Sequence, residues 1–141
     1  MPTRNANAVW RGGLKDGSGE VALGSGAFSG PYSFASRFEQ AGGSNPEELL
    51  GAAHAGCFSM ALAAALERAG HQADEVKTAA EVTLEMVDGA PTITRIDLVC
   101  RAVVPGIGEA GFQEQAEGAK KNCPVSKALA GTEIHLDAKL V

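Results

Sequence analysis

The longest apolar stretch of the chain runs from Leu49 to Leu66 and contains no charged residue. Its small and apolar residues fall on every side of a helix, which is typical of a helix surrounded by protein. The residues before it, Asn45 to Glu48, are typical of a helix start: an asparagine that can cap, a proline suited to the first position and two glutamates that favour the helix dipole. We therefore expect a long central helix that stops at Gly70.

A helix of this length could also span a membrane. The run is only just long enough, is dominated by Ala and Gly rather than Leu and Ile, and includes His54 and Ser59. We therefore expect a soluble protein with no membrane partner.

Residues 1–44 alternate short β-like runs with glycine-rich turns. Strands are expected at 8–11, 19–23 and 32–38, forming a hairpin or meander. Because such short strands bury little surface alone, this N-terminal β arm needs another surface, either the rest of the domain or a second subunit.

After the central helix, alternating apolar and polar residues predict three strands. Two helices are expected between the second and the third of these strands. Strands are expected at 76–87, 92–104 and around 134–140, and helices at 111–122 and 124–129. On the first strand Ala80, Val82, Leu84 and Met86 share one face, and on the second Ile96, Leu98, Cys100, Ala102 and Val104 do. The fold class is α+β: one domain over residues 1–141, with antiparallel strands wrapped around the long helix.

Charge and cysteine content narrow the function classes. The net charge of −5 arises from scattered residues with no basic run, so nucleic acid is not an expected partner. The N-terminus has no apolar core for secretion, which favours the cytoplasm. Three cysteines are too few for a secreted disulfide scaffold. We expect Cys100 to be a small buried residue of the core.

The other two cysteines occupy special places. Cys57 lies within the apolar helix, where it is either a packing residue or a reactive group. Cys123 precedes Pro124 at an expected helix break, where it is either a simple cap or a thiol in a field that favours thiolate. Position alone leaves both alternatives open.

Arg37 precedes the central helix and is the candidate partner of a thiolate. A nearby guanidinium, which keeps its own proton, lowers the pKa of a thiol and increases the thiolate fraction at neutral pH. An arginine buried there needs a carboxylate, and Glu47 and Glu48 are the nearest acids in sequence. Glu47 and Cys57 would be about 15 Å apart on a straight helix. Either the helix breaks near Gly51 or Gly56, or a second subunit brings the groups together.

Three segments resemble a known family. They are Arg37-Phe38-Glu39, the run NPEELLGAAHAGCFSMAL from Asn45 to Leu62, and NCPVSKAL from Asn122 to Leu129. In this order they resemble the OsmC/Ohr family of thiol-dependent hydroperoxide reductases, and the OsmC (osmotically inducible protein C) branch more than the Ohr branch.

The resemblance implies a role for four residues. Cys57 matches the peroxidatic cysteine, Cys123 the resolving cysteine that forms a disulfide with it, Arg37 the arginine that stabilises the thiolate, and Glu47 the acid that pairs with that arginine. It also implies an intertwined homodimer acting in oxidative or osmotic stress defence. No bound cofactor or metal is implied, and an external dithiol, a lipoylated protein or a small dithiol, reduces the disulfide.

Three other functions are compatible with parts of the sequence. His54 and Cys57 on one helix face suggest a Cys/His hydrolase, although a mid-helix nucleophile lacks oxyanion donors. Cys57, Cys123 and His54 suggest a thiolate metal site, which the absence of a C-x-x-C spacing weakens. The third rival is a non-catalytic ligand-binding member of the same fold.

The sequence also suggests a substrate preference. Organic hydroperoxides are favoured over hydrogen peroxide by apolar residues near Cys57, namely Leu49, Phe58 and Met60.

Overall fold

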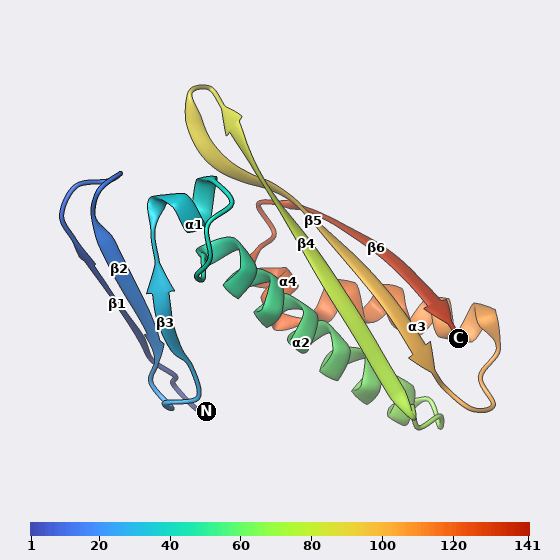
Figure 1. Cartoon of the computed structure of the whole chain (residues 1–141). Coiled ribbons are helices and arrows are strands. Elements are labelled where there is room, and N and C mark those ends of the chain that lie inside the picture. Colours follow the sequence, from blue (N-terminus) through green and yellow to red (C-terminus); the bar gives the residue numbers. More distant parts are fainter. The chain divides into compact units, whose positions relative to one another are not determined.

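The computed structural model describes residues 1–141, and Figure 1 traces the whole chain. The chain divides into two compact units, Met1–Leu49 and Leu50–Val141. The expectation of a single domain with a β arm over residues 1–44 stays a prediction beside this division.

The first unit contains a three-stranded antiparallel sheet in the order β1-β2-β3. Its strands are β1 (Ala6–Arg11), β2 (Ser18–Leu23) and β3 (Ser29–Tyr32). The predicted meander is therefore confirmed.

The expected strand over residues 32–38 is wrong, because β3 ends at Tyr32 and a short helix, α1 (Phe34–Phe38), follows. The Ser33 hydroxyl accepts from the Ser36 N–H at 3.0 Å, and the Ser36 hydroxyl accepts from the Ser33 N–H at 2.9 Å. This reciprocal capping box starts a helix where alternation predicted a strand.

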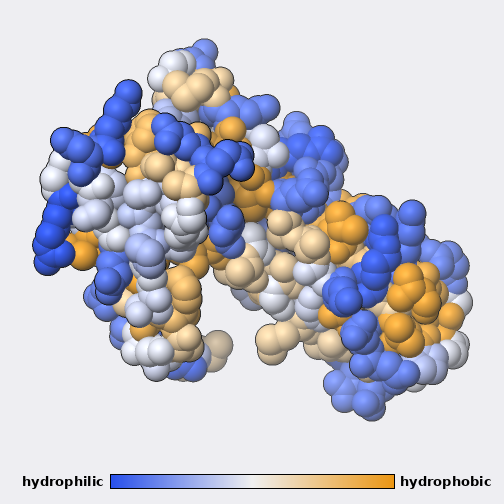
Figure 2. Space-filling model, in the orientation of Figure 1, coloured by the Kyte–Doolittle hydropathy of each residue, from blue (hydrophilic) through white to orange (hydrophobic).

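The first unit has no hydrophobic core of its own. No residue of Met1–Leu49 belongs to the buried apolar cluster of the protein. Its largest side chains meet in pairs, with ring centroids 5.3 Å apart for Trp10 and Tyr32. Apolar atoms are visible at the surface of the molecule (Figure 2), and this unit exposes Val9, Leu23, Phe28 and Phe38.

The long helix α2 extends from Pro46 to Arg68, as predicted. The Asn45 side-chain oxygen accepts a hydrogen bond from the Glu48 N–H at 2.8 Å, so the expected cap is present. At the other end Gly70 has a φ of 90°, which is the left-handed conformation that glycine supplies at helix ends.

Only one stripe of α2 is buried within the chain. The buried positions recur at helical spacing: Gly51, His54, Phe58, Leu62 and Leu66. Ala52, Ala53 and Gly56 are exposed on the other side, and Met60 is 77% exposed. The expectation that protein surrounds this helix is therefore not met by a single chain. By length and composition α2 could cross a membrane, which is weak evidence by itself, and one stripe of the helix packs in the hydrophobic core.

The second unit is built on a sheet of order β4-β5-β6. Its strands are β4 (Glu75–Val87), β5 (Ala90–Val103) and β6 (Glu133–Leu140). β4 and β5 form a hairpin through Asp88 and Gly89, both at positive φ, which suits a two-residue turn. The α+β class is correct, but β6 pairs parallel with β5 rather than antiparallel. The connection between β5 and β6 explains this pairing. It crosses over through two helices, so β6 runs in the same direction as β5.

Those helices are α3 (Glu109–Asn122) and α4 (Pro124–Ala128). α2 and α3 lie along one face of the sheet (Figure 1) and share a core with it. From the strands and α3 this core takes Ile96, Leu98, Cys100, Ala102, Val104, Phe112, Ala116, Ala119 and Ala138.

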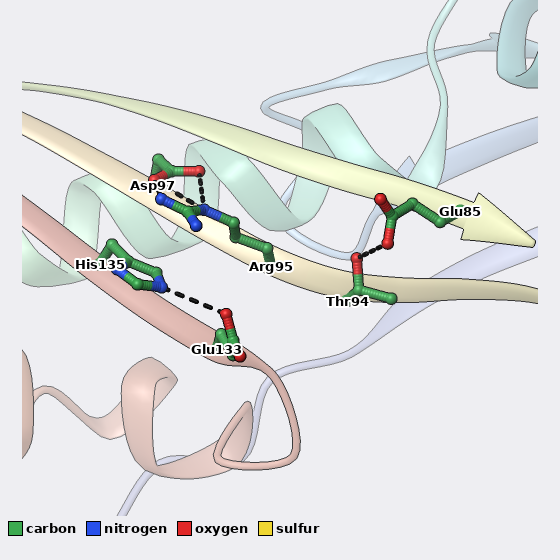
Figure 3. Close-up of polar contacts among 6 residues, drawn as sticks. All are labelled: Glu85, Thr94, Arg95, Asp97, Glu133 and His135. Carbon is green, nitrogen blue, oxygen red and sulfur yellow. Dashed lines mark hydrogen bonds and ion pairs between the residues drawn. The ribbon is translucent and has the colours of Figure 1, made fainter. Parts of the chain in front are cut away.

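The five positions predicted to face inward on β5 are all buried. On β4 the prediction fails for Met86, which is 67% exposed, because it lies near the end of the hairpin, beyond the core. Polar pairs cover the outer face (Figure 3): Arg95 Nη2 lies 2.7 Å from Asp97 Oδ1, and Thr94 donates to Glu85 at 2.8 Å.

We expect Leu98→Ala to lower the free energy of unfolding by about 2–5 kcal/mol, because it leaves a cavity at the centre of this core. Denaturant unfolding at one protein concentration measures the change. The control Met86→Ala, at an exposed position, should change it by less than about 1 kcal/mol. Equal losses in both variants would contradict this placement of the core.

Candidate functional site

Cys123 stands between two helices and is completely buried. It ends α3, with its N–H donating to Ala119 O at 2.9 Å, and it precedes the first residue of α4. Its φ of −55° and ψ of 125° are not helical, which is the conformation that a following proline imposes. The predicted helix break at Cys123-Pro124 is therefore confirmed.

The Sγ atoms of Cys57 and Cys123 lie 2.8 Å apart, although 66 positions separate the residues in sequence. Both cysteines belong to the unit Leu50–Val141 and both are free thiols. Cys57, on α2, is half-buried, whereas Cys123 is inaccessible to solvent. A molecule arriving from solvent can therefore reach only Cys57.

The two thiols have opposite pKa shifts. Burial raises the pKa of Cys57, and its contact with Cys123 adds to the increase. Burial also acts to raise the pKa of Cys123, but the Cys57 thiol, Ser126 and the Val125 N–H lower it on balance. Ser126 and Val125 belong to α4, and the Cys123 side chain makes no capping hydrogen bond there. Burial therefore opposes the Cys57 thiolate within this unit, and a nearby cation would favour it.

His54 lies one helical turn before Cys57, and its side chain is completely buried. Its Nε2 lies 2.7 Å from the hydroxyl oxygen of Ser126, and burial lowers its pKa. No hydrogen bond joins the imidazole to Cys57, so the pair required by a Cys/His hydrolase is not formed. No group of three His, Cys, Asp or Glu side chains is arranged to hold a metal ion.

Arg37 and Glu47 form an ion pair within the first unit. The Arg37 Nε and Nη2 atoms donate to Oε1 of Glu47 at 3.0 and 2.8 Å. Of the two acids nearest in sequence, Glu47 is the partner; Glu48 is exposed. Glu47 is buried, and its Oε2 has no hydrogen-bond partner. Nη1 of Arg37 is not engaged by this carboxylate and can bind another group.

A small cavity of about 200 Å³ lies beside Arg37 in the same unit. Aromatic and apolar side chains dominate its lining, and the Arg37 guanidinium carbon lies 5.2 Å from the Phe38 ring. The lining residues are Trp10, Leu14, Tyr32, Ser33, Phe34, Arg37 and Phe38. The cavity therefore combines one cation with an apolar wall.

One of the two expected solutions to the distance between Glu47 and Cys57 does not occur. α2 is continuous from Pro46 to Arg68, with no break at Gly51 or Gly56. The ten residues between Glu47 and Cys57 therefore correspond to about 15 Å of helix. The structure joins Arg37 to Glu47 within the first unit and Cys57 to Cys123 within the second.

At two residues the structure differs from the sequence-based prediction of the site. Ser126 was not identified, although it is the third residue of α4 after the cap position Cys123, where an N–H faces the capping side chain. Phe58 was expected near a substrate, but it is completely buried in the core of the second unit. Leu49 is half-buried and Met60 is exposed.

Comparison with known proteins gives concordant matches. The family model for OsmC-like protein matches residues 39–139. The chain is 45% identical over 138 residues to Peroxiredoxin OsmC of Escherichia coli (strain K12), covering 97% of this chain and 96% of that protein. It is 33% identical over 92 residues to the Organic hydroperoxide resistance protein of Xanthomonas axonopodis pv. citri (strain 306), covering 63% of this chain and 61% of that protein.

The fold agrees with a solved structure. The organic hydroperoxide resistance protein OhrB of Bacillus subtilis superposes with a TM-score of 0.76 at 25% identity, covering 96% of this chain and 98% of that one. The match to the family model, the near full-length relative and this shared fold have one explanation: the chain belongs to the OsmC-like protein family.

Proposed function

We propose that this protein is a thiol-dependent peroxidase that reduces organic hydroperoxides to alcohols. The observation that carries the proposal is the contact between two thiols, 2.8 Å apart, of which only Cys57 is accessible to solvent. The names of its relatives, Peroxiredoxin OsmC and Organic hydroperoxide resistance protein, support the same activity. We assign Cys57 as the peroxidatic and Cys123 as the resolving cysteine.

The reaction proceeds in two sulfur-based steps. The Cys57 thiolate attacks the peroxide, an S–O bond forms as the O–O bond breaks, and the alkoxide leaves as alcohol after taking a proton. Cys123 then attacks the sulfenic acid of Cys57, forming the S–S bond and releasing water. An external dithiol, either a lipoylated protein or a small dithiol, restores both thiols by exchange. No bound cofactor takes part in either step.

Arg37 is assigned as the cation that stabilises the Cys57 thiolate, with Glu47 holding its guanidinium in place. The raised pKa of Cys57 in its own unit creates the need for such a cation. Because Nε and Nη2 are held by Glu47, Nη1 is left to bind the thiolate or the peroxide. The unbroken helix between Glu47 and Cys57 favours an Arg37 supplied by a second copy of the chain.

A homodimer also accounts for surfaces that one chain leaves uncovered. The first unit lacks a hydrophobic core and exposes apolar side chains. α2 is free of charge from Leu49 to Leu66, yet Met60 and its neighbours on that face are exposed. A second copy that covers this face would bury the helix on all sides, as its sequence pattern predicts.

The substrate class follows from the cavity beside Arg37. Its aromatic wall favours the organic part of an alkyl or aryl hydroperoxide, which hydrogen peroxide lacks. We also infer a cytoplasmic site of action, consistent with cysteines held as free thiols. The alternative of a non-catalytic ligand-binding protein gives no reason for two thiols in contact.

One equivalent of cumene hydroperoxide added to the reduced protein should consume two thiols, and peptide mapping should find them joined as Cys57–Cys123. Cys57→Ser should abolish this loss, whereas Cys123→Ser should stop the reaction at the sulfenic acid. Cys100→Ser, at the buried cysteine of β5 that is not part of this pair, is the control. Persistence of both thiols in the wild-type protein would favour the ligand-binding alternative.

Arg37→Ala should raise the pKa of Cys57 and slow its oxidation at neutral pH by at least about tenfold, because the thiolate loses its cation. The rate should recover as the pH rises and Cys57 ionises without help. Stopped-flow oxidation across a pH series measures both effects, with Arg68→Ala at the C-terminal end of α2, the helix that carries Cys57, as control. An unchanged pH profile would rule out this role for Arg37.

Light scattering should give twice the chain mass of 14.4 kDa for the wild-type protein. Met60→Glu should shift the mass toward the monomer and reduce peroxidase activity, because it places a charge on the face that a second copy would cover. Ala110→Glu, an exposed change on α3, should preserve the dimer. A monomeric wild-type protein with full activity would refute the assembly and the supply of Arg37 in trans.

A further inference from the structure

His54 is a completely buried ionisable group to which the two-cysteine reaction gives no task. Its only hydrogen bond joins Nε2 to the Ser126 hydroxyl at 2.7 Å, and its buried Nδ1 has no partner. Burial lowers the pKa of His54, so the imidazole is neutral at physiological pH. A neutral imidazole carries one N–H proton. The nitrogen that holds this proton determines whether the Ser126 hydroxyl accepts a hydrogen bond from His54 or donates one to it.

The unpartnered Nδ1 indicates where that proton lies. A buried N–H without an acceptor carries the full cost of its desolvation, and orphaned donors are rarer in proteins than under-satisfied acceptors. The proton is therefore better placed on Nε2, which donates to Ser126. Nδ1 then carries only a lone pair.

This tautomer directs the Ser126 proton. A hydroxyl has a single hydrogen to donate, and here its oxygen already accepts from His54. Ser126 is the third residue of α4 after the cap position Cys123, and its side chain is among the groups that lower the pKa of that thiol. Ser126 is itself buried, so no solvent competes for its proton.

We propose that His54 and Ser126 are positioning residues for Cys123, joined to it by the chain Nε2–H to Oγ–H to Sγ. Building on the peroxidase function proposed above, this chain stabilises the Cys123 thiolate as it attacks the oxidised Cys57. The S–S bond forms, the S–O bond breaks and its electron pair leaves with hydroxide. The hydroxide takes up a proton equivalent to the one that Cys123 lost, so the sum is one disulfide and one water.

The test separates the two steps of the reaction. Reduced protein is mixed with one equivalent of cumene hydroperoxide, the Cys57 sulfenic acid is trapped with dimedone at timed intervals, and disulfide formation is followed from pH 6 to pH 10. Ser126→Ala and His54→Leu should slow disulfide formation by at least about tenfold near pH 6, because a hydrogen bond to a charged group is lost. The deficit should shrink toward pH 10, where Cys123 ionises in every variant.

Conservative variants distinguish this role from a general structural one. His54→Gln keeps an N–H near the Nε2 position and Ser126→Thr keeps a hydroxyl, so both should restore most of the rate. Ser59→Ala removes a different hydroxyl of α2, one that donates to Thr78 at 2.8 Å, and should leave the pH profile in place.

Two results would overturn the inference: a loss equal at every pH, or equal rates in His54→Leu, His54→Gln and the wild type. Either can be recognised only when dimedone traps a sulfenic acid on Cys57. If no sulfenic acid forms in the wild-type protein, the peroxidase function itself fails, and with it this role. Ser126→Ala removes a single oxygen atom, so it keeps the test decisive if His54→Leu does not fold.

Discussion

The geometry of the two thiols depends on the steric restriction that Pro124 places on the residue before it. Because Cys123 cannot adopt a helical conformation there, α3 ends and α4 begins at the same residue. The junction makes Cys123 both the end of one helix and the cap position of the next. Its sulfur then lies against α2 and faces the donors of α4, so a local backbone rule determines which groups surround the buried thiol.

The second constraint is that the two sides of α2 have different surroundings. One stripe of the helix fills the core beneath the sheet, and the same stripe includes His54, so the imidazole is held by packing as well as by its hydrogen bond. The other side of the helix carries no charge and is left open by a single chain. One helix thus serves the core, the thiol pair and an uncovered apolar face, which explains its uniform apolar composition.

Much of this arrangement could be predicted from the sequence, and the parts that could not have physical reasons. The capped helix, the hairpin at Asp88 and the break at Cys123 follow from short-range rules and are correct. The parallel pairing of β6 and the exposure of Met86 were missed, because strand direction and the extent of the core depend on contacts between distant segments. The bond between His54 and Ser126 joins residues 72 positions apart, so no local pattern indicates it.

The crossover between β5 and β6 also has a mechanical consequence. Cys57 lies before the sheet in sequence and Cys123 lies inside the crossover, so a bond between them would enclose nearly half of the chain, 66 positions, in a covalent loop. Closing a loop of that length removes unfolded-state entropy equivalent to about 4 kcal/mol. The oxidised protein would then resist heat and proteases better than the reduced one. Each catalytic cycle would alternate a more stable, oxidised form with a less stable, reduced form. The melting temperature would therefore report the redox state.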